Sequence, residues 1–170
     1  NIELCISEYA VNYDFALDID INFRFKSTLY MALLKMTYTK QNLLGACIFN
    51  FKDDAYFGMI DQKYWENGQL VDSVLKSGNY YMTELFYRHL GQNIVATEVA
   101  APTFSSPSLG WMPEQQDIPY LNSLATLNRN SDTLFVIVIN SDSLNAYETT
   151  ITLNSLEWNA ALLGITTLSA

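Results

Sequence analysis

Two polar residues stand at the ends of apolar segments, where side chains often do chemistry. Glu8 is the next-to-last residue of the segment 2–9, and Asn50 is the next-to-last residue of the segment 43–51. In a parallel sheet whose strands are each followed by a helix, functional groups gather at the carboxyl ends of the strands. Neighbouring strands lie about 4.8 Å apart, so two such side chains can both reach one small ligand. This placement makes Glu8 a candidate nucleophile and Asn50 a candidate substrate contact.

Each of these residues also has a plainer interpretation. A carboxylate at a strand end often caps the next segment or faces water, and asparagine is a common turn residue. Asp53 follows the second segment beside Asp54, but an acidic pair of this kind is usually a solvated turn. Position and residue type alone do not choose between a catalytic and a structural role for Glu8.

The elements that would hold these residues follow from the apolar pattern. Residues 23–40 predict a helix, because apolar side chains recur there at spacings of three and four. The segment 43–51 is apolar throughout, as expected for a strand buried on both faces of a parallel sheet. Strand, helix and strand then form one right-handed crossover. Residues 80–90 predict a second helix, which we expect Gly91 to end as its C′ residue.

The rest of the chain predicts a long loop and then a β-region. Residues 52–78 are rich in aromatic and acidic side chains, and loops of this length are often functional. After residue 92 the pattern becomes β-branched, which divides the chain into an α/β region, 1–92, and an all-β region, 93–170. Strands are expected at 94–99, 118–127, 134–139 and 147–153, whereas Pro102, Pro107 and Pro113 argue against regular structure between the first two.

Composition excludes some partners. The chain has 170 residues, of which 18 are acidic and 9 basic, for a formal net charge of -9. Such a field repels phosphate backbones, so we expect no nucleic-acid partner, whereas neutral sugars are indifferent to it. Apolar runs such as 134–139 are too short to span a bilayer, so no membrane partner is expected. The first residue is not Met and no signal-peptide pattern follows, so we expect a processed or cut N-terminus. Secreted, periplasmic and cytoplasmic locations all stay open.

The two cysteines and the single histidine do not suggest a metal centre or a disulfide framework. Cys5 and Cys47 lie three residues before Glu8 and Asn50, so strand alternation predicts that both face the helices as buried, reduced thiols. His89 lies in a helical pattern and is expected to be structural. We therefore predict no metal and no cofactor.

The order of these pieces resembles that of a known family. Ser7-Glu8-Tyr9 ends a strand, Phe49-Asn50-Phe51 ends the next, Tyr80-Tyr81 opens a helix, and His89-Leu90-Gly91 closes it. The later part contains Ile118-Pro119-Tyr120-Leu121, Ala125-Thr126 and the run 134–140. Together these pieces resemble the last two strand–helix units and the C-terminal β-sandwich of the α-L-arabinofuranosidases, which are retaining glycoside hydrolases.

This resemblance implies a fold and a reaction. The fold is a partial (β/α) barrel over 1–92, followed by an antiparallel β-sandwich over 93–170. The reaction is a double displacement in which Glu8 attacks the anomeric carbon and forms a glycosyl–enzyme intermediate. Asn50 and Trp65 would contact the carbohydrate substrate. For Trp65, packing at the edge of a core is the open alternative.

The resemblance also implies a missing partner. The proton donor of such enzymes lies on an earlier strand, about 5–5.5 Å from the nucleophile, so we expect it in a barrel portion before Asn1. Glu3 does not replace it, because five residues along a strand place it on the opposite face. Glu66, in the predicted loop, is the other carboxylate to test. We therefore expect the chain to be inactive alone and to need that N-terminal barrel portion as its partner.

Two other interpretations stay open. One is a different retaining glycosidase, such as a β-xylosidase or an endoglucanase with a similar tail. The other is a non-catalytic carbohydrate-binding or structural module, in which Glu8 has no chemical role.

Overall fold

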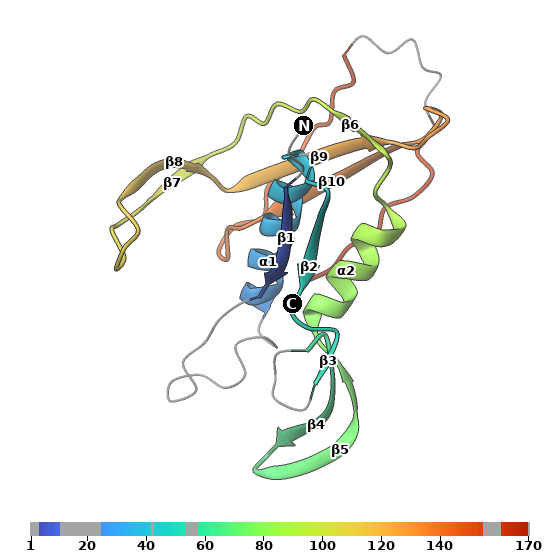
Figure 1. Ribbon diagram of the computed structural model, residues 1–170. Helices are drawn as coiled ribbons and strands as arrows, with labels where there is room; N and C mark the ends of the chain where they lie inside the picture. The colour runs from blue at the N-terminus through green and yellow to red at the C-terminus, as the bar shows by residue number, and fades with distance from the viewer. Residues whose placement is uncertain (1–3, 11–24, 42, 54–57, 155–160, 170) are drawn as a thin grey trace.

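The computed structural model describes residues 4–10, 25–41, 43–53, 58–154 and 161–169 (Figure 1). It shows a mixed α/β chain with several antiparallel sheets, and the described residues form no closed barrel. In chain order the elements are β1 (Cys5–Tyr9), α1 (Phe25–Lys40), β2 (Gly45–Ile48), β3 (Lys52–Asp53), β4 (Ile60–Glu66), β5 (Gln69–Lys76), α2 (Gly78–Arg88), β6 (Asn93–Val95), β7 (Thr103–Ser106), β8 (Gln115–Pro119), β9 (Leu121–Leu127) and β10 (Leu134–Asn140).

The first strand–helix–strand unit forms as the sequence predicts. β1 and β2 pair in parallel as a two-stranded sheet, and α1 connects them. The register contains one irregularity, because Ile6 pairs with Ala46 and Tyr9 pairs with Ile48. β1 therefore advances three residues while β2 advances two, which is the signature of a β-bulge.

One hydrophobic cluster joins the two halves of the chain. Its buried members are Tyr9, Met31, Ala32, Met36, Met82, Phe86, Leu124 and Ile139. They come from β1, both helices and two strands of the later part, so α1 is packed between the parallel pair and the β9–β10 strands. Three of them are methionines, whose flexible side chains fill irregular gaps between elements. A boundary near Gln92 would therefore separate two parts that share a core.

Two glycines allow the helices to approach their neighbours closely. A Cβ atom on Gly78, the first residue of α2, would lie 2.1 Å from the Thr28 hydroxyl oxygen on α1. A Cβ atom on Gly91 would lie 2.2 Å from the Leu127 carbonyl oxygen, and the Gly91 N–H donates to the Thr126 hydroxyl at 2.8 Å. The prediction that Gly91 is the C′ residue of α2 is wrong, because α2 ends at Arg88 with His89 as its C-cap. Gly91 instead permits the contact between the chain after α2 and strand β9.

The predicted loop over 52–78 is instead mostly β-structure. β4 and β5 form an antiparallel hairpin, and the short β3 pairs in parallel with the start of β4. The hairpin turns at Asn67 and Gly68, whose φ angles are 49° and 77°. An Asn-Gly pair with both φ angles positive is typical of a two-residue type I′ hairpin turn. The sequence therefore carried the signal for this hairpin.

The later part of the chain contains a three-stranded antiparallel sheet and a separate hairpin. β9 pairs along its whole length with β10, and β6 adds to its other side. β7 and β8 form an antiparallel hairpin where the prolines argued against regular structure, and Figure 1 shows it projecting from the body. The strand expected at 147–153 is not present, because an alternating segment becomes a strand only where a neighbour completes its hydrogen bonds.

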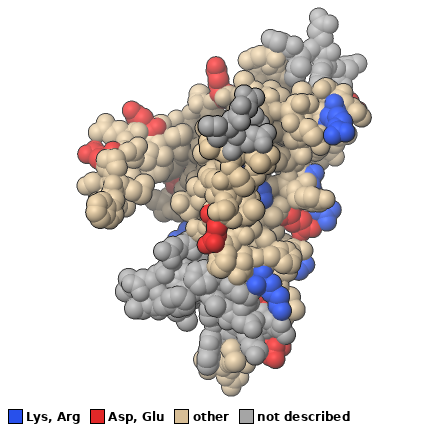
Figure 2. All heavy atoms as spheres, viewed as in Figure 1, with Lys and Arg blue, Asp and Glu red and all other residues tan. Residues whose placement is uncertain are grey.

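No helix in the described parts of the chain has both the length and the apolarity needed to cross a bilayer. On the face shown in Figure 2, charged side chains are scattered over a largely uncharged surface.

Candidate functional site

Glu8 lies next to the last residue of β1 and is exposed to solvent. The two β1 residues that pack on the hydrophobic cluster are Ile6 and Tyr9, which the bulge brings to the same face of the sheet. Side chains alternate along a strand, so a residue next to Tyr9 belongs to the opposite face. The bulge therefore turns Glu8 away from the helices.

The same face also carries the two cysteines, so the prediction that they are buried against the helices is wrong. Cys5 and Cys47 are both exposed and free. On β2, Ala46 and Ile48 pack against the cluster, which leaves Cys47 between them on the opposite face. For Cys5 the prediction failed because simple alternation back from Glu8 ignores the extra residue in β1.

We call this side of the β1–β2 pair the uncovered face, and it bears Cys5, Glu8 and Cys47. Figure 1 shows α1 behind the two strands, and no other described element packs on their opposite side. Large apolar residues flank the pair and are exposed: Leu4, Leu44, Phe49 and Phe51. An apolar area next to an uncovered, two-stranded sheet is typical of a surface that another polypeptide covers.

Asn50 lies just beyond β2, at the same end of the sheet as Glu8. The Phe49 N–H donates a hydrogen bond to the Tyr9 carbonyl oxygen at 2.8 Å. The residue before Asn50 is therefore hydrogen-bonded to the residue after Glu8. The Phe49–Asn50 peptide bond is cis. Asn50 is half-buried, and its backbone carbonyl oxygen accepts a hydrogen bond from the Met59 backbone N–H at 3.0 Å. The structure thus brings the two candidate residues to one end of two paired strands, as the sequence predicts.

Trp65 and Glu66 lie further away, near the turn of the β4–β5 hairpin. Their backbones pair with Leu70 and Gln69. β4 begins next to the end of β2, where the Ile60 N–H donates to the Phe51 carbonyl oxygen at 3.0 Å. At about 3.3 Å per residue, the backbone of Trp65 is about 17 Å along the strand from that point. The structure does not bring these two residues to the Glu8 end of the sheet.

Asp61 is a carboxylate whose position the sequence analysis missed. It was counted among the acidic residues of a surface loop, but it is fully buried in β4, opposite Leu75. Burying a carboxylate costs free energy unless other groups stabilise it. The choice of residue at this position is therefore more constrained than in a solvated loop. The Asn-Gly turn would have placed Asp61 in a strand, although not on its buried side.

Two ionisable side chains have pKa values that burial perturbs. Burial raises the pKa of the Tyr9 hydroxyl, and the neighbouring Tyr38 and Cys47 add to this effect. Burial lowers the pKa of Lys35, whose ammonium lies 5.6 Å from the centre of the Phe86 ring. Among the described residues, no group of three or more His, Cys, Asp and Glu side chains is placed to hold a metal ion.

The chain is similar to known proteins in structure, but the sequence comparisons found no match. No protein-family model matches the chain, and no curated protein matches it. An α-L-arabinofuranosidase from Thermotoga maritima, solved with arabinose, aligns over 81% of this chain with a TM-score of 0.65 and 18% identity. A thermostable GH51 α-L-arabinofuranosidase from Thermotoga petrophila aligns over the same share of this chain, with a TM-score of 0.59 and 17% identity. A further arabinofuranosidase also aligns over 81% of this chain, with a TM-score of 0.60 and 18% identity.

The alignments cover only part of those enzymes. In each case this chain spans 28% of the length of the solved protein. The sequence resemblance therefore holds at the level of the fold: the aligned 81% of this chain folds like a part of the GH51 α-L-arabinofuranosidases.

Proposed function

We propose that this chain is the C-terminal part of a retaining glycoside hydrolase that releases arabinofuranosyl residues from plant-type polysaccharides or oligosaccharides. Residues 1–92 contribute the last two strand–helix units of a (β/α) barrel, and residues 93–170 contribute a β-sandwich domain. Glu8 is the nucleophile, and Asn50 contacts the sugar. Trp65 offers an aromatic surface for a more distant part of the substrate.

The position of Glu8 carries this proposal. It is a carboxylate at the carboxyl end of a parallel strand, on the uncovered face, and active sites of such barrels lie at that end. The uncovered face becomes the inner wall of the barrel once the remaining strands are added. The likeness of the fold to arabinofuranosidases supports the choice of sugar.

The reaction follows from a pair of carboxyl groups about 5–5.5 Å apart. Glu8 attacks the anomeric carbon while a second carboxylic acid protonates the leaving oxygen, so the glycosidic bond breaks and a glycosyl ester forms. That second group, now a carboxylate, removes a proton from water. The water attacks the same carbon, releases the sugar and restores Glu8.

The second carboxyl group belongs to the barrel portion that this chain lacks. We call the chain together with that portion the assembled enzyme. The 170-residue chain alone should show no hydrolysis, because the proposal places the proton donor in that other portion. Detectable turnover by the chain alone would contradict this part of the proposal.

Kinetics of the assembled enzyme on an aryl arabinofuranoside test the role of Glu8. Glu8→Gln should lower kcat by on the order of 10³-fold or more while substrate binding and thermal unfolding stay unchanged. Glu98→Gln, at an exposed glutamate of the later part, is the matched control and should retain full turnover. Equal activity of both variants would remove Glu8 from the mechanism.

A second candidate function is supported by the exposure of Glu8 in this chain. In a non-catalytic carbohydrate-binding module, Glu8 would be a solvated strand-end residue, and Glu8→Gln would change neither binding nor stability.

Comparison of aryl arabinofuranoside with aryl xyloside as substrates separates the arabinofuranosidase from a β-xylosidase. Preference for the xyloside would keep the mechanism and change the sugar.

A further inference from the structure

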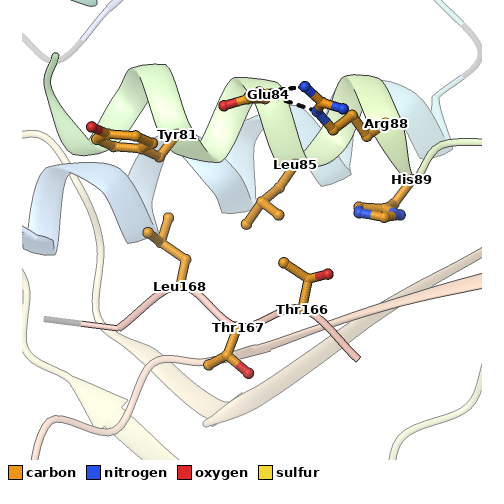
Figure 3. A pocket seen from close by; sticks show the side chains of 8 residues that line it. All are labelled: Tyr81, Glu84, Leu85, Arg88, His89, Thr166, Thr167 and Leu168. Atoms are coloured by element: carbon orange, nitrogen blue, oxygen red, sulfur yellow. Dashed lines mark hydrogen bonds and ion pairs between the residues drawn. The ribbon is translucent and has the colours of Figure 1, made fainter. Parts of the chain in front are cut away.

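A second concave site lies on α2, away from the uncovered face. Its volume is about 450 Å³, within the range of about 300–1,000 Å³ typical of small-molecule sites. One wall is α2 and its C-cap, and the other is the segment 166–168 (Figure 3). None of its lining residues belongs to β1 or β2, so it is separate from the proposed catalytic centre.

The helical wall is a single stripe of side chains. Tyr81, Glu84, Leu85, Arg88 and His89 are spaced by three and four residues, which places them on one side of a helix. The neighbouring side of α2 is fixed in the core through Met82 and Phe86 (both 3% exposed). Leu168, on the facing segment, also packs against the core cluster. Both walls are therefore anchored, and the site does not depend on a loop closing over it.

The charges in this site are balanced. Oε1 of Glu84 accepts hydrogen bonds from Nε and Nη2 of Arg88, at 3.1 and 2.8 Å. This pair leaves the second carboxylate oxygen as an acceptor and the remaining guanidinium N–H groups as donors. The site therefore presents hydrogen-bonding groups of both kinds without a net charge.

Other polar groups around the site are also available to a ligand. No hydrogen bond among the described residues uses the Tyr81 hydroxyl, the His89 imidazole or the Thr167 hydroxyl. Between them, the Tyr81 ring and the Leu85 side chain offer apolar surface, and Figure 3 shows Leu85 directed toward the facing segment. Donors, acceptors and an aromatic face are thus combined in one hollow.

We propose that this site binds one or two units of a neutral oligosaccharide. Sugar hydroxyls both donate and accept, which matches the mixed polar groups, and the C–H face of a sugar ring packs on an aromatic ring. An acidic ligand is disfavoured, because Glu84 already neutralises Arg88 and the chain carries a net charge of -9. This inference rests on the proposed function for the class of its ligand. It adds a second carbohydrate-binding site, on α2, which would hold the substrate polymer away from the catalytic centre.

Titration of the 170-residue chain with arabinotriose, followed by amide NMR shifts, tests the site. The amides of Leu85 and Thr167 should shift, with a dissociation constant in the millimolar range. Tyr81→Ala should weaken binding at least fivefold. Tyr87→Ala, a tyrosine on the same helix that is 87% exposed and does not line the site, is the matched control and should bind like the parent chain.

A second variant tests the charge argument without removing the aromatic ring. Glu84→Gln leaves Arg88 without its counter-charge, so binding of trigalacturonate relative to arabinotriose should rise about tenfold. Equal arabinotriose binding by Tyr81→Ala and the parent, shifts confined to other amides, or no shift at 50 mM ligand would each overturn the inference. These readouts involve no turnover, so they fail or succeed independently of the catalytic role proposed for Glu8.

Discussion

The antiparallel β6–β9–β10 sheet and the parallel β1–β2 pair differ in how many of their strand and packing contacts come from this chain. β9 pairs with β10 through seven consecutive residues, gains β6 on its other side, and places Leu124 at 1% exposure in the core. The β1–β2 pair has two strands, an irregular register and one packed face, with exposed apolar residues around it. The antiparallel sheet is stabilised by what this chain contains. The parallel pair has the form of a piece whose other contacts come from further polypeptide.

The largest expected effect concerns access to the uncovered face. Cys5 and Cys47 should both react quickly with a maleimide in the chain alone, since both thiols are exposed. In the assembled enzyme the added strands cover this face, and the labelling rate should fall at least about 100-fold, a change equivalent to about 2.7 kcal/mol of protection. Cys5→Ser reports on Cys47 separately. Unchanged labelling in the assembled enzyme would show that the added portion covers some other surface.

The difference in packing should also appear in stability. Leu124→Ala removes a side chain from the shared core and should lower the free energy of unfolding by about 2–5 kcal/mol. Leu44→Ala, at 67% exposure beside β2, should change it by less than about 0.5 kcal/mol in the chain alone. Denaturant unfolding measures both. A large loss from Leu44→Ala would mean that the parallel pair is already packed within this chain.

A smaller effect tests the junction between α2 and β9. Gly91→Ala places a methyl group against the Leu127 backbone and should cost about 1–3 kcal/mol, because the contact is with main-chain atoms that cannot rotate away. Gly164→Ala is the control, since no atom of the described residues lies within 4 Å of the added atom. If thermal unfolding moves equally in both variants, the close approach at Gly91 does not hold the two regions together.

The smallest effect belongs to the turn after β10. Hydrogen bonds from Tyr147, Asn145 and the Leu144 backbone lower the pKa of Asp142 to about 2, from 3.8. A lowered pKa in the folded state stabilises the fold above about pH 4, and that contribution is lost as the pH falls toward 2. Asp142→Asn should therefore flatten the stability profile between these values. Glu148→Gln, at an exposed carboxylate nearby, should leave the profile as it is.

Local pattern predicted the helices and the parallel pair, because each depends on residues close in sequence. The period of apolar residues gave α1 and α2 to within two residues at either end. The Asn67-Gly68 pair held the signal for the β4–β5 hairpin, but the aromatic and acidic composition of the segment favoured a loop. Composition was the weaker indicator.

The faces of the strands were harder to predict than the strands themselves. One extra residue between Ile6 and Tyr9 reverses the alternation along β1, so Cys5 and Glu8 share a face although simple alternation assigns them to opposite faces. A bulge depends on the partner strand, and a single strand carries no mark of it. The proton donor cannot be inferred in the same way, because the proposed function assigns it to the added barrel portion.

The most direct measurement is chemical trapping on Glu8. A slow-turnover arabinofuranoside with a good leaving group is mixed with the assembled enzyme, and the digested protein is analysed by mass spectrometry. We expect one added pentosyl group on the peptide that contains Glu8, and none in Glu8→Gln. A pentosyl group on another carboxylate, or full turnover without any trapped ester, would contradict it.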